Sequence, residues 1–266
     1  MQDIHTHLYW ESYDDDRDEV IARAREAGVS EMLVVGTTLE ESRKAVALAS
    51  QYENIFVSVG IHPNEFRGEV GEYLGELEKI AQDRKVVAIG ECGLDYSVSH
   101  GGIDETTKAR QKKGFAEQLA LANTLALPVI VHCRDAYRDL LLILKEHEVT
   151  VPIIMHCYMG DTSVTEEFLA LPNIYFSFTG NITYPVKKHL VGTSEDITET
   201  VRLIPKERIF VETDCPFLAP QSMRGKRNEP AYATYTAEKV RELLDVTREV
   251  LEVQLTENFR TVFKVD

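Results

Sequence analysis

The segment PVIVHC, residues 128–133, decides the fold that the sequence predicts. It is short, rich in Val and Ile, and bounded by turn residues, which is typical of a buried parallel strand. Similar segments recur along the chain: QDIH (2–5), EMLVVG (31–36), IFVSVG (55–60), KVVAIG (85–90), PIIMHC (152–157), IYFSF (174–178) and RIFVET (208–213). The sequence therefore predicts eight buried strands.

Helical patterns separate these strands. Residues 18–28, 41–52 and 107–125 carry apolar side chains at helical spacing, and Gly28 is a predicted C-cap. Residues 232–265 predict two or three further helices. Eight strands alternating with helices fit an α/β protein with a (β/α)8 barrel of the TIM type, which needs about 250 residues. A doubly wound open sheet is the alternative, because periodicity does not show whether a sheet closes.

Length and composition indicate one globular domain over residues 1–266. The chain is 44% hydrophobic and 27% charged, and no Pro/Gly/Ser-rich linker divides it. No apolar run suits a membrane span or a secretory signal, so we expect a cytoplasmic protein with no membrane contact. No segment indicates an obligate protein partner. The acidic run Asp14–Asp16 is interpreted as a solvated loop that leads into a helix.

The net charge of −15 lacks the basic character that is usual in nucleic-acid-binding proteins. Any polyanionic substrate would therefore need local positive charge from metal ions or clustered arginines. Cysteine spacing indicates neither a disulfide framework nor a zinc ribbon, because the four cysteines lie far apart without a C-x-x-C motif.

Metal-ligating residue types gather at the ends of the predicted strands, where the active sites of such barrels lie. These residues are His5, His7, His62, Glu91, His132, His156 and Asp214. Each alone is also consistent with a buried histidine or a helix cap, but metal binding gives one reason for all of them. Such a set contains more ligands than one catalytic zinc needs, and it suits two ions that share a carboxylate. The remaining histidines, His100, His147 and His189, are expected on loops or helix surfaces.

Several neighbouring residues receive supporting roles. Each cysteine directly follows a proposed ligand, so strand alternation turns its thiol away, and we expect packing rather than metal ligation for Cys92, Cys133, Cys157 and Cys215. Glu212 lies two residues before Asp214, and we expect it to orient the metal ligands without binding the metal itself. Tyr96 and Tyr158 are candidates for stacking on bases or for packing.

Seven motifs resemble those of the TatD family of metal-dependent hydrolases, in the amidohydrolase superfamily. They are DIHTHL, VGIHP, GECGLDY, PVIVHCRDA, MHCYMG, ETDCPFLAP and RGKRNEP, and they span nearly the whole chain. The family pattern is not matched everywhere. Asn64 stands where a second histidine is common, which should alter substrate contacts, and Cys92 and Met159 also depart from the usual residues.

The resemblance implies a TIM-type barrel that holds one or two divalent ions, of zinc, magnesium or manganese. His5, His7, Glu91 and Asp214 would hold one ion, and His132, His156 and the bridging Glu91 would hold the second. His62 would contact substrate or phosphate. Family members look like nucleases that cleave DNA phosphodiesters, often from the 3′ end, so we expect a deoxyribonuclease with DNA as its substrate.

The expected reaction uses a metal-activated water, with Asp214 as general base and Glu91 as the bridging catalytic carboxylate. Arg134 and a basic cluster of Arg224, Lys226 and Arg227 would hold flanking phosphates, since the guanidinium matches phosphate geometry. Two alternatives remain open at this point. One is an ester or amide hydrolase of the same superfamily, for example one acting on misacylated tRNA. The other is a non-catalytic barrel that serves as a binding module.

Overall fold

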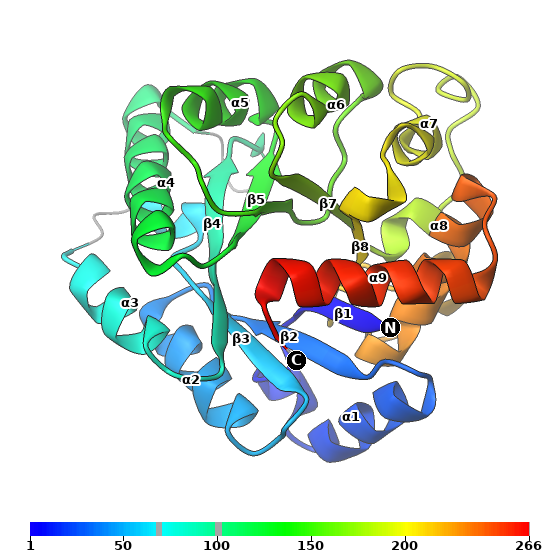
Figure 1. Cartoon of the computed structure of the whole chain (residues 1–266), viewed down its shortest axis with the longest axis horizontal. Helices are drawn as coiled ribbons and strands as arrows, with labels where there is room; N and C mark the ends of the chain where they lie inside the picture. Colours follow the sequence, from blue (N-terminus) through cyan, green and yellow to red (C-terminus); the bar gives the residue numbers. More distant parts are fainter. Residues whose placement is uncertain (68–70, 99–102, 266) are drawn as a thin grey trace. The chain divides into compact units, whose positions relative to one another are not determined.

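The computed structural model describes residues 1–67, 71–98 and 103–265. All eight predicted strands are present, and the helices fall between and after them (Figure 1). The strands are β1 (Gln2–Thr6), β2 (Glu31–Val35), β3 (Ile55–Val59), β4 (Val86–Asp95), β5 (Val129–Arg134), β6 (Ile153–Met155), β7 (Ile174–Phe178) and β8 (Ile209–Val211). The helices are α1 (Arg17–Glu26), α2 (Leu39–Ala49), α3 (Leu74–Ala81), α4 (Glu105–Leu125), α5 (Tyr137–Glu146), α6 (Thr162–Leu169), α7 (Ile197–Leu203), α8 (Ala233–Leu244) and α9 (Arg248–Phe263).

The order of the strands distinguishes the two architectures that the sequence left open. Over the described residues the sheet has eight strands in the simple order β1 to β8, whereas a doubly wound sheet reverses its order at a switch point. The last strand also returns to the first. Thr6 pairs with Cys215 just after β8, and the backbone N–H of Asp214 donates to the carbonyl of His5 at 2.9 Å. The predicted (β/α)8 barrel is confirmed.

The chain divides into two compact units. Unit 1 comprises Met1–Val34 and Cys157–Asp266, and unit 2 comprises Val35–His156. The single domain expected over residues 1–266 stays a prediction.

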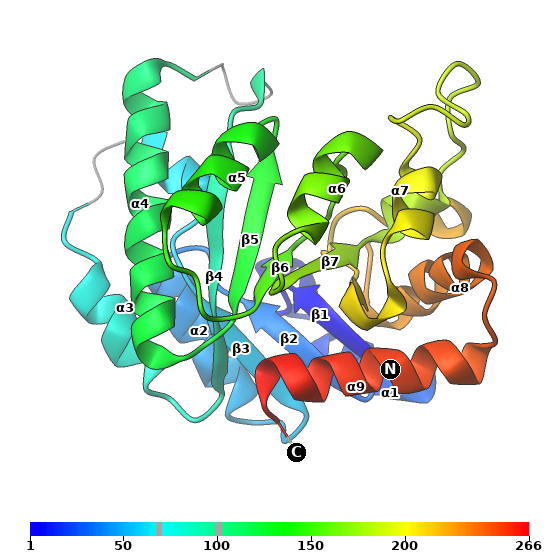
Figure 2. The same cartoon turned by 45° about the horizontal axis from the view of Figure 1, so that its top comes forward.

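In unit 1, helix α9 runs past the amino-terminal end of β1 (Figure 2) and also contacts the beginning of β8. Asn258 on α9 donates through Nδ2 to the carbonyl of Ile209 at 2.8 Å, and Gln2 donates to Thr256 Oγ1 at 3.3 Å. The carboxyl-terminal ends of the two strands, which carry the predicted ligands, therefore lie away from α9. Two helices, α8 and α9, occupy the region where two or three were predicted.

In unit 2, two buried amides of α4 hold the ends of β3 and β4. Gln118 accepts the backbone N–H of Ile61 at 2.8 Å, and Gln111 accepts the N–H of Asp95 at 3.0 Å. Both glutamines are fully buried. A buried amide that accepts a backbone N–H in this way holds that part of the chain in place. Gln118 thus fixes the segment just before His62, and Gln111 fixes the end of β4 at Asp95.

Strand β4 is longer than the sequence predicted. Residues 85–90 were expected to form a strand ending at Glu91, but β4 continues through Asp95. Gly90 and Gly93 have φ values of 130° and 139°, and a Cβ on either would lie 2.3 Å or less from a carbonyl oxygen of β5. The register against β5 shifts between Ile89 and Cys92. The two glycines thus let β4 pair closely with β5 past the point where it was expected to stop.

The smaller expectations agree with the structure where it describes them. The run Asp14–Asp16 leads directly into α1, and Gly28 follows that helix with φ of 92°. His147 and His189 are exposed, whereas His100 lies outside the described residues. No helix in the described ranges is long and apolar enough to cross a membrane.

Candidate metal and substrate site

One candidate metal cluster lies in unit 1, where β1 meets the end of β8. His5 lies on β1 and His7 directly follows this strand, and the spacing of two residues predicts that the two imidazoles point the same way. The Nε2 atoms of these two residues lie 3.8 and 3.5 Å from Oδ1 of Asp214. Both histidines are buried, and the Asp214 side chain is 15% exposed. The three predicted ligands from distant parts of unit 1 are therefore brought together.

Asp3 connects the two segments that carry this cluster, a role that was not predicted from the sequence. It lies on the same face of β1 as His5. Its carboxylate accepts bonds from Thr213 N and Thr213 Oγ1, at 3.0 and 2.6 Å, and from His5 N at 3.3 Å. Complete burial raises the pKa of Asp3 to about 8, although the bonds from Thr213 oppose the shift. Asp3 thus ties the strand that carries His5 to the segment that carries Asp214.

The second candidate cluster lies in unit 2 around the carboxylate of Glu91. Its Oε1 atom faces three imidazoles, with His132 Nδ1 at 2.8 Å, His62 Nε2 at 3.4 Å and His156 Nε2 at 3.8 Å. Glu91 is only 4% exposed. A buried carboxylate among imidazoles is the donor set expected for a divalent ion, and the bridging role of Glu91 stays a prediction.

Asp95 lies on the far side of His132 and is a second residue that the sequence reasoning missed. His132 Nε2 is 3.3 Å from Asp95 Oδ2, a close ionic contact rather than a well-aligned hydrogen bond. Burial lowers the pKa of His132, but Asp95 and Glu91 outweigh it and raise that pKa above its usual value. Burial raises the pKa of Asp95, yet the contacts with His132 and Ser97 leave it well below its usual range. Had the predicted strand been continued to Asp95, alternation along it would have placed Asp95 on the same face as Glu91.

His62 differs from the other imidazoles in its hydrogen bonding. Its Nδ1 accepts the backbone N–H of Asn64 at 3.1 Å, so in the neutral ring the proton sits on Nε2, which faces Glu91. Burial, and then the neighbouring His132, lower the pKa of His62 and favour this neutral form. The position of His62 beside Glu91 and His132 also suits a metal ligand. In this tautomer, however, its Nε2 is a hydrogen-bond donor, which is what contact with a phosphate oxygen of a substrate needs.

Asn64, the position that departs from the family pattern, contacts the same carboxylate. Its Nδ2 lies 3.4 Å from Asp95 Oδ2, and its Oδ1 accepts a bond from Arg67 Nε at 3.0 Å. The amide therefore connects an arginine to the carboxylate that faces His132. An amide keeps its charge state at all accessible pH values, so this link does not switch on protonation.

The predicted phosphate-binding arginines lie in different surroundings. Arg134 is exposed at the end of β5, and Arg224 is exposed with its guanidinium 4.9 Å from the ring of Tyr184. Arg227 instead binds Asp16 at 2.6 Å, donates to the carbonyl of Ser12, and lies over the ring of Tyr13. Its guanidinium is already used to join the loop after β8 to the segment before α1.

The supporting roles predicted for the four cysteines and Glu212 stay predictions, and the structure describes the surroundings of these residues. Cys92, Cys133 and Cys215 are buried, and burial raises the pKa of each thiol, to about 12 for Cys215. Among the described residues, no candidate metal cluster includes a cysteine. Cys157 is half-buried, and its backbone N–H donates to Glu212 Oε1 at 2.8 Å. Glu212 therefore holds the backbone at Cys157 within unit 1.

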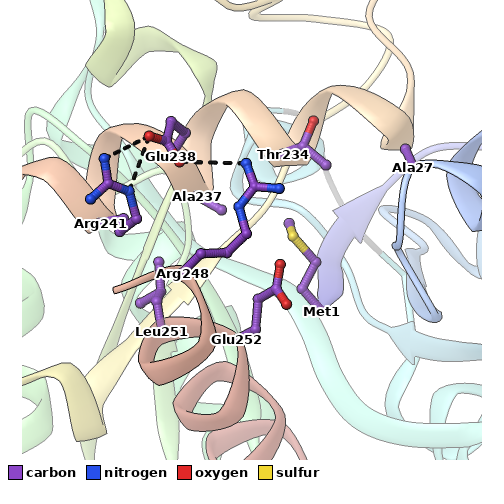
Figure 3. A pocket seen from close by; sticks show the side chains of 9 residues that line it. All are labelled: Met1, Ala27, Thr234, Ala237, Glu238, Arg241, Arg248, Leu251 and Glu252. Atoms are coloured by element: carbon purple, nitrogen blue, oxygen red, sulfur yellow. Dashed lines mark hydrogen bonds and ion pairs between the residues drawn. The ribbon is translucent and has the colours of Figure 1, made fainter. Parts of the chain in front are cut away.

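A small pocket elsewhere in unit 1 holds none of the predicted ligands. It lies between α8, α9 and the amino-terminal end of β1 (Figure 3). The residues that line it are Met1, Ala27, Thr234, Ala237, Glu238, Arg241, Arg248, Leu251 and Glu252. Glu238 pairs with Arg241 at 2.7 Å and with Arg248 at 3.7 Å. Because both guanidiniums face this carboxylate, the pocket does not present a concentrated positive charge.

The donor geometry of each cluster fits a divalent ion. Donor atoms around a tetrahedral ion with bonds of about 2.0–2.1 Å stand roughly 3.3–3.4 Å apart. Most of the separations measured in the two clusters, 3.4 to 3.8 Å, are close to this value, and the direct contact between His132 and Glu91 is shorter. Imidazole with carboxylate suits zinc, and the carboxylates also suit magnesium or manganese, so the donors fit more than one metal.

Comparisons with known proteins give matches along the whole chain. A family model described as TatD related DNase matches residues 2–264. The chain is 39% identical over 265 residues to the uncharacterized metal-dependent hydrolase YabD of Bacillus subtilis (strain 168), covering 99% of both proteins. It is 36% identical over 271 residues to the 3′-5′ ssDNA/RNA exonuclease TatD of Klebsiella pneumoniae (strain 342), covering 100% of this chain and 98% of that protein.

The fold has a similar match among solved structures. The crystal structure of YJJV, a TatD homolog from Escherichia coli K12, superposes with a TM-score of 0.89 at 28% sequence identity. The superposition covers 100% of this chain and 98% of that one. The likeness therefore extends over the complete alternation of strands and helices rather than over one motif.

Proposed function

Because the chain belongs to the TatD family of metal-dependent hydrolases, we propose that it cleaves phosphodiester bonds of single-stranded nucleic acid from the 3′ end. DNA is the expected substrate. The observation that carries the proposal is the pair of donor clusters, one at Asp214 and one at Glu91, each made of the residue types that hold divalent ions. The name of the exonuclease relative supports the nucleic-acid substrate.

The proposal assigns the metal ligands as the family motifs do. His5, His7 and Asp214 would hold one ion, His132 and His156 would hold the second, and Glu91 would bridge the two. Bound divalent ions supply a water that deprotonates near neutral pH and positive charge that stabilises the phosphoryl transition state. Zinc, magnesium and manganese are all compatible with these donors.

The remaining steps belong to side chains of the protein. Asp214 takes the proton of the attacking water as general base, since its carboxylate is both partly exposed and adjacent to His7. His62 donates its Nε2 hydrogen to a phosphate oxygen. Arg134 and Arg224 hold phosphates of neighbouring nucleotides, which their exposure allows. Arg227 also belongs to the predicted substrate contacts, but it would have to release Asp16 first.

An end-labelled single-stranded DNA oligonucleotide tests the proposed function. The oligonucleotide is labelled at the 5′ or the 3′ end and incubated with magnesium, manganese or zinc in turn. We expect a metal-dependent ladder that EDTA abolishes, that Glu91→Gln largely loses, and that shortens the 5′-labelled strand one nucleotide at a time. Absence of cleavage with every ion would overturn the proposal. Hydrolysis of aminoacyl-tRNA by the same preparation would then favour an ester hydrolase. The expected cytoplasmic location stays a prediction.

A further inference from the structure

Two aromatic side chains lie directly beside the first metal cluster. The indole of Trp10 stacks on the ring of His7, with centroids 5.1 Å apart and planes at 27°. The ring of Phe217 meets the indole edge-to-face at 5.2 Å. Phe217 is 48% exposed, although it is a large apolar side chain. The aromatic pair thus extends from a predicted metal ligand out to solvent.

The backbone that carries this exposed ring is firmly held. Phe217 N donates to the carbonyl of Asp214 at 2.9 Å, and its own carbonyl accepts a bond from Asn228 Nδ2 at 2.5 Å. Asn228 is fully buried. On the other side, Trp10 N donates to the carbonyl of His7 at 3.1 Å. With its backbone held in this way, an exposed aromatic ring has only its own side-chain rotations to lose when a flat ligand covers it.

The two aromatic candidates named from the sequence do not offer such a surface in the described structure. Tyr158, a candidate from the sequence, is buried, and Tyr96 donates to Asp139 with Lys108 over its ring. Among the described Phe, Tyr and Trp residues, Tyr235 is the other one with an exposed side chain. It lies on α8 against Tyr232, with centroids 5.9 Å apart. Phe217 is therefore distinguished by its position next to Asp214 as well as by its exposure.

We propose that Trp10 and Phe217 form a stacking site for a nucleobase next to the scissile phosphate. This inference rests on the proposed function and specifies how the strand is held. Every base has a flat π-face, so stacking binds single strands without reading their sequence. A chain with a net charge of −15 gains little from general attraction to a polyanion, and stacking supplies affinity that does not depend on charge. Paired bases are already stacked, so the site favours single strands.

Substrates with and without a base at one position test this proposal. The set contains a normal oligonucleotide and three versions with a single abasic nucleotide at the first, second or third position from the cleaved end. For the wild-type protein we expect one of these positions to lower kcat/KM about 5- to 150-fold. For Phe217→Ala we expect the ratio between normal and abasic substrate at that position to fall close to one.

Two further variants complete this test. Phe217→Trp should restore the ratio, whereas Phe217→Leu, which keeps an apolar side chain without a ring, should not. Tyr235→Ala is the matched control and should keep the wild-type ratio. Equal losses by Phe217→Ala on all substrates, or an unchanged ratio, would overturn the stacking site. Cleavage of no oligonucleotide by the wild-type protein would instead refute the proposed function.

Fluorescence gives a readout that needs no catalysis, because Trp10 is the single tryptophan of the chain. Oligothymidylate added to Glu91→Gln should quench the emission of Trp10, and an abasic oligomer of the same length should not. Binding of both oligomers is followed in parallel by fluorescence anisotropy of a distant label. Bound oligothymidylate without a change in tryptophan emission would contradict stacking at this site even if the protein is a nuclease.

Discussion

The imidazole of His132 lies between two buried carboxylates, with Nε2 3.3 Å from Asp95 Oδ2 and Nδ1 2.8 Å from Glu91 Oε1. Asp95 therefore favours the tautomer in which Nε2 carries the proton and Nδ1 offers its lone pair for an ion. Carboxylates in this position behind a histidine ligand orient the ring and raise its basicity.

We expect Asp95→Asn to lower the affinity for the divalent ion about 10- to 100-fold, because a neutral amide holds the imidazole proton less strongly than a carboxylate does. Affinity is measured by competition with a fluorescent chelator, and activity should return at higher metal concentration. Asp139→Asn is the control, since that carboxylate binds Lys112 and Tyr96 instead. An unchanged affinity in Asp95→Asn would show that His132 needs no orienting carboxylate.

Replacing Glu91 should affect catalysis more strongly than replacing Asp95. We expect Glu91→Gln to lower kcat/KM by more than about a hundredfold. That is the largest loss typical of residues that only hydrogen-bond to metal ligands. Asp95→Asn should recover with added metal, whereas Glu91→Gln should not. Circular dichroism checks that the fold is kept, and elemental analysis measures bound metal. Full activity of Glu91→Gln would refute its bridging role.

We expect Arg224 and Arg227 to have different roles, with Arg224 contacting the substrate and Arg227 stabilising the fold. We expect Arg224→Ala to raise KM for single-stranded DNA and to reduce the slope of log KM against log salt by about 0.7, the value for one phosphate contact. Its thermal midpoint should stay unchanged. If Arg224→Ala leaves both KM and the salt slope unchanged, it does not contact the strand.

Arg227→Ala should lower stability by about 1 kcal/mol, because the guanidinium binds Asp16 and covers Tyr13. For a chain of this size that corresponds to a thermal midpoint lower by about 2–4 °C. Thermal unfolding followed by circular dichroism measures the change. A reduced salt slope at full stability would instead place Arg227 among the phosphate contacts.

Asp196 should make stability depend on pH at the start of α7. Its carboxylate accepts bonds from Gly192 N at 2.9 Å and from Thr198 N at 2.9 Å. Burial raises the pKa of Asp196, but these bonds outweigh it and lower the pKa below the usual 3.8. The stabilisation is therefore complete above pH 3.8 and is lost as the pH falls through the lower, folded-state pKa.

We expect Asp196→Ala to lower the free energy of unfolding by about 1–2 kcal/mol at pH 7, as for other lost N-caps. The difference between the wild-type protein and Asp196→Asn should shrink as the pH falls below 3.8. Urea unfolding at pH 7, 5 and 3.5 measures both effects. A difference that stays constant across this range would show that the charge of Asp196 contributes nothing.

The grouping of the predicted ligands within each unit was largely predictable because it follows from short-range periodicity. Side chains alternate along a strand, so His5 and His7 had to share a face, and parallel strands end at the same edge of a barrel. The same alternation would have found Asp3. It failed at Asp95, because Gly90 and Gly93 extend β4 through close contacts with β5 that the sequence of β4 alone does not show.

The sequence by itself determined the order of strands and helices, the residue types at the strand ends and the family to which the chain belongs. Only the tertiary structure decided what lies next to these residues. It placed Asp95 behind His132, engaged Arg227 with Asp16, buried Tyr158, and brought Phe217 against Trp10. The physical reason is that alternation and helical spacing act over a few residues, whereas these contacts join segments far apart in the chain.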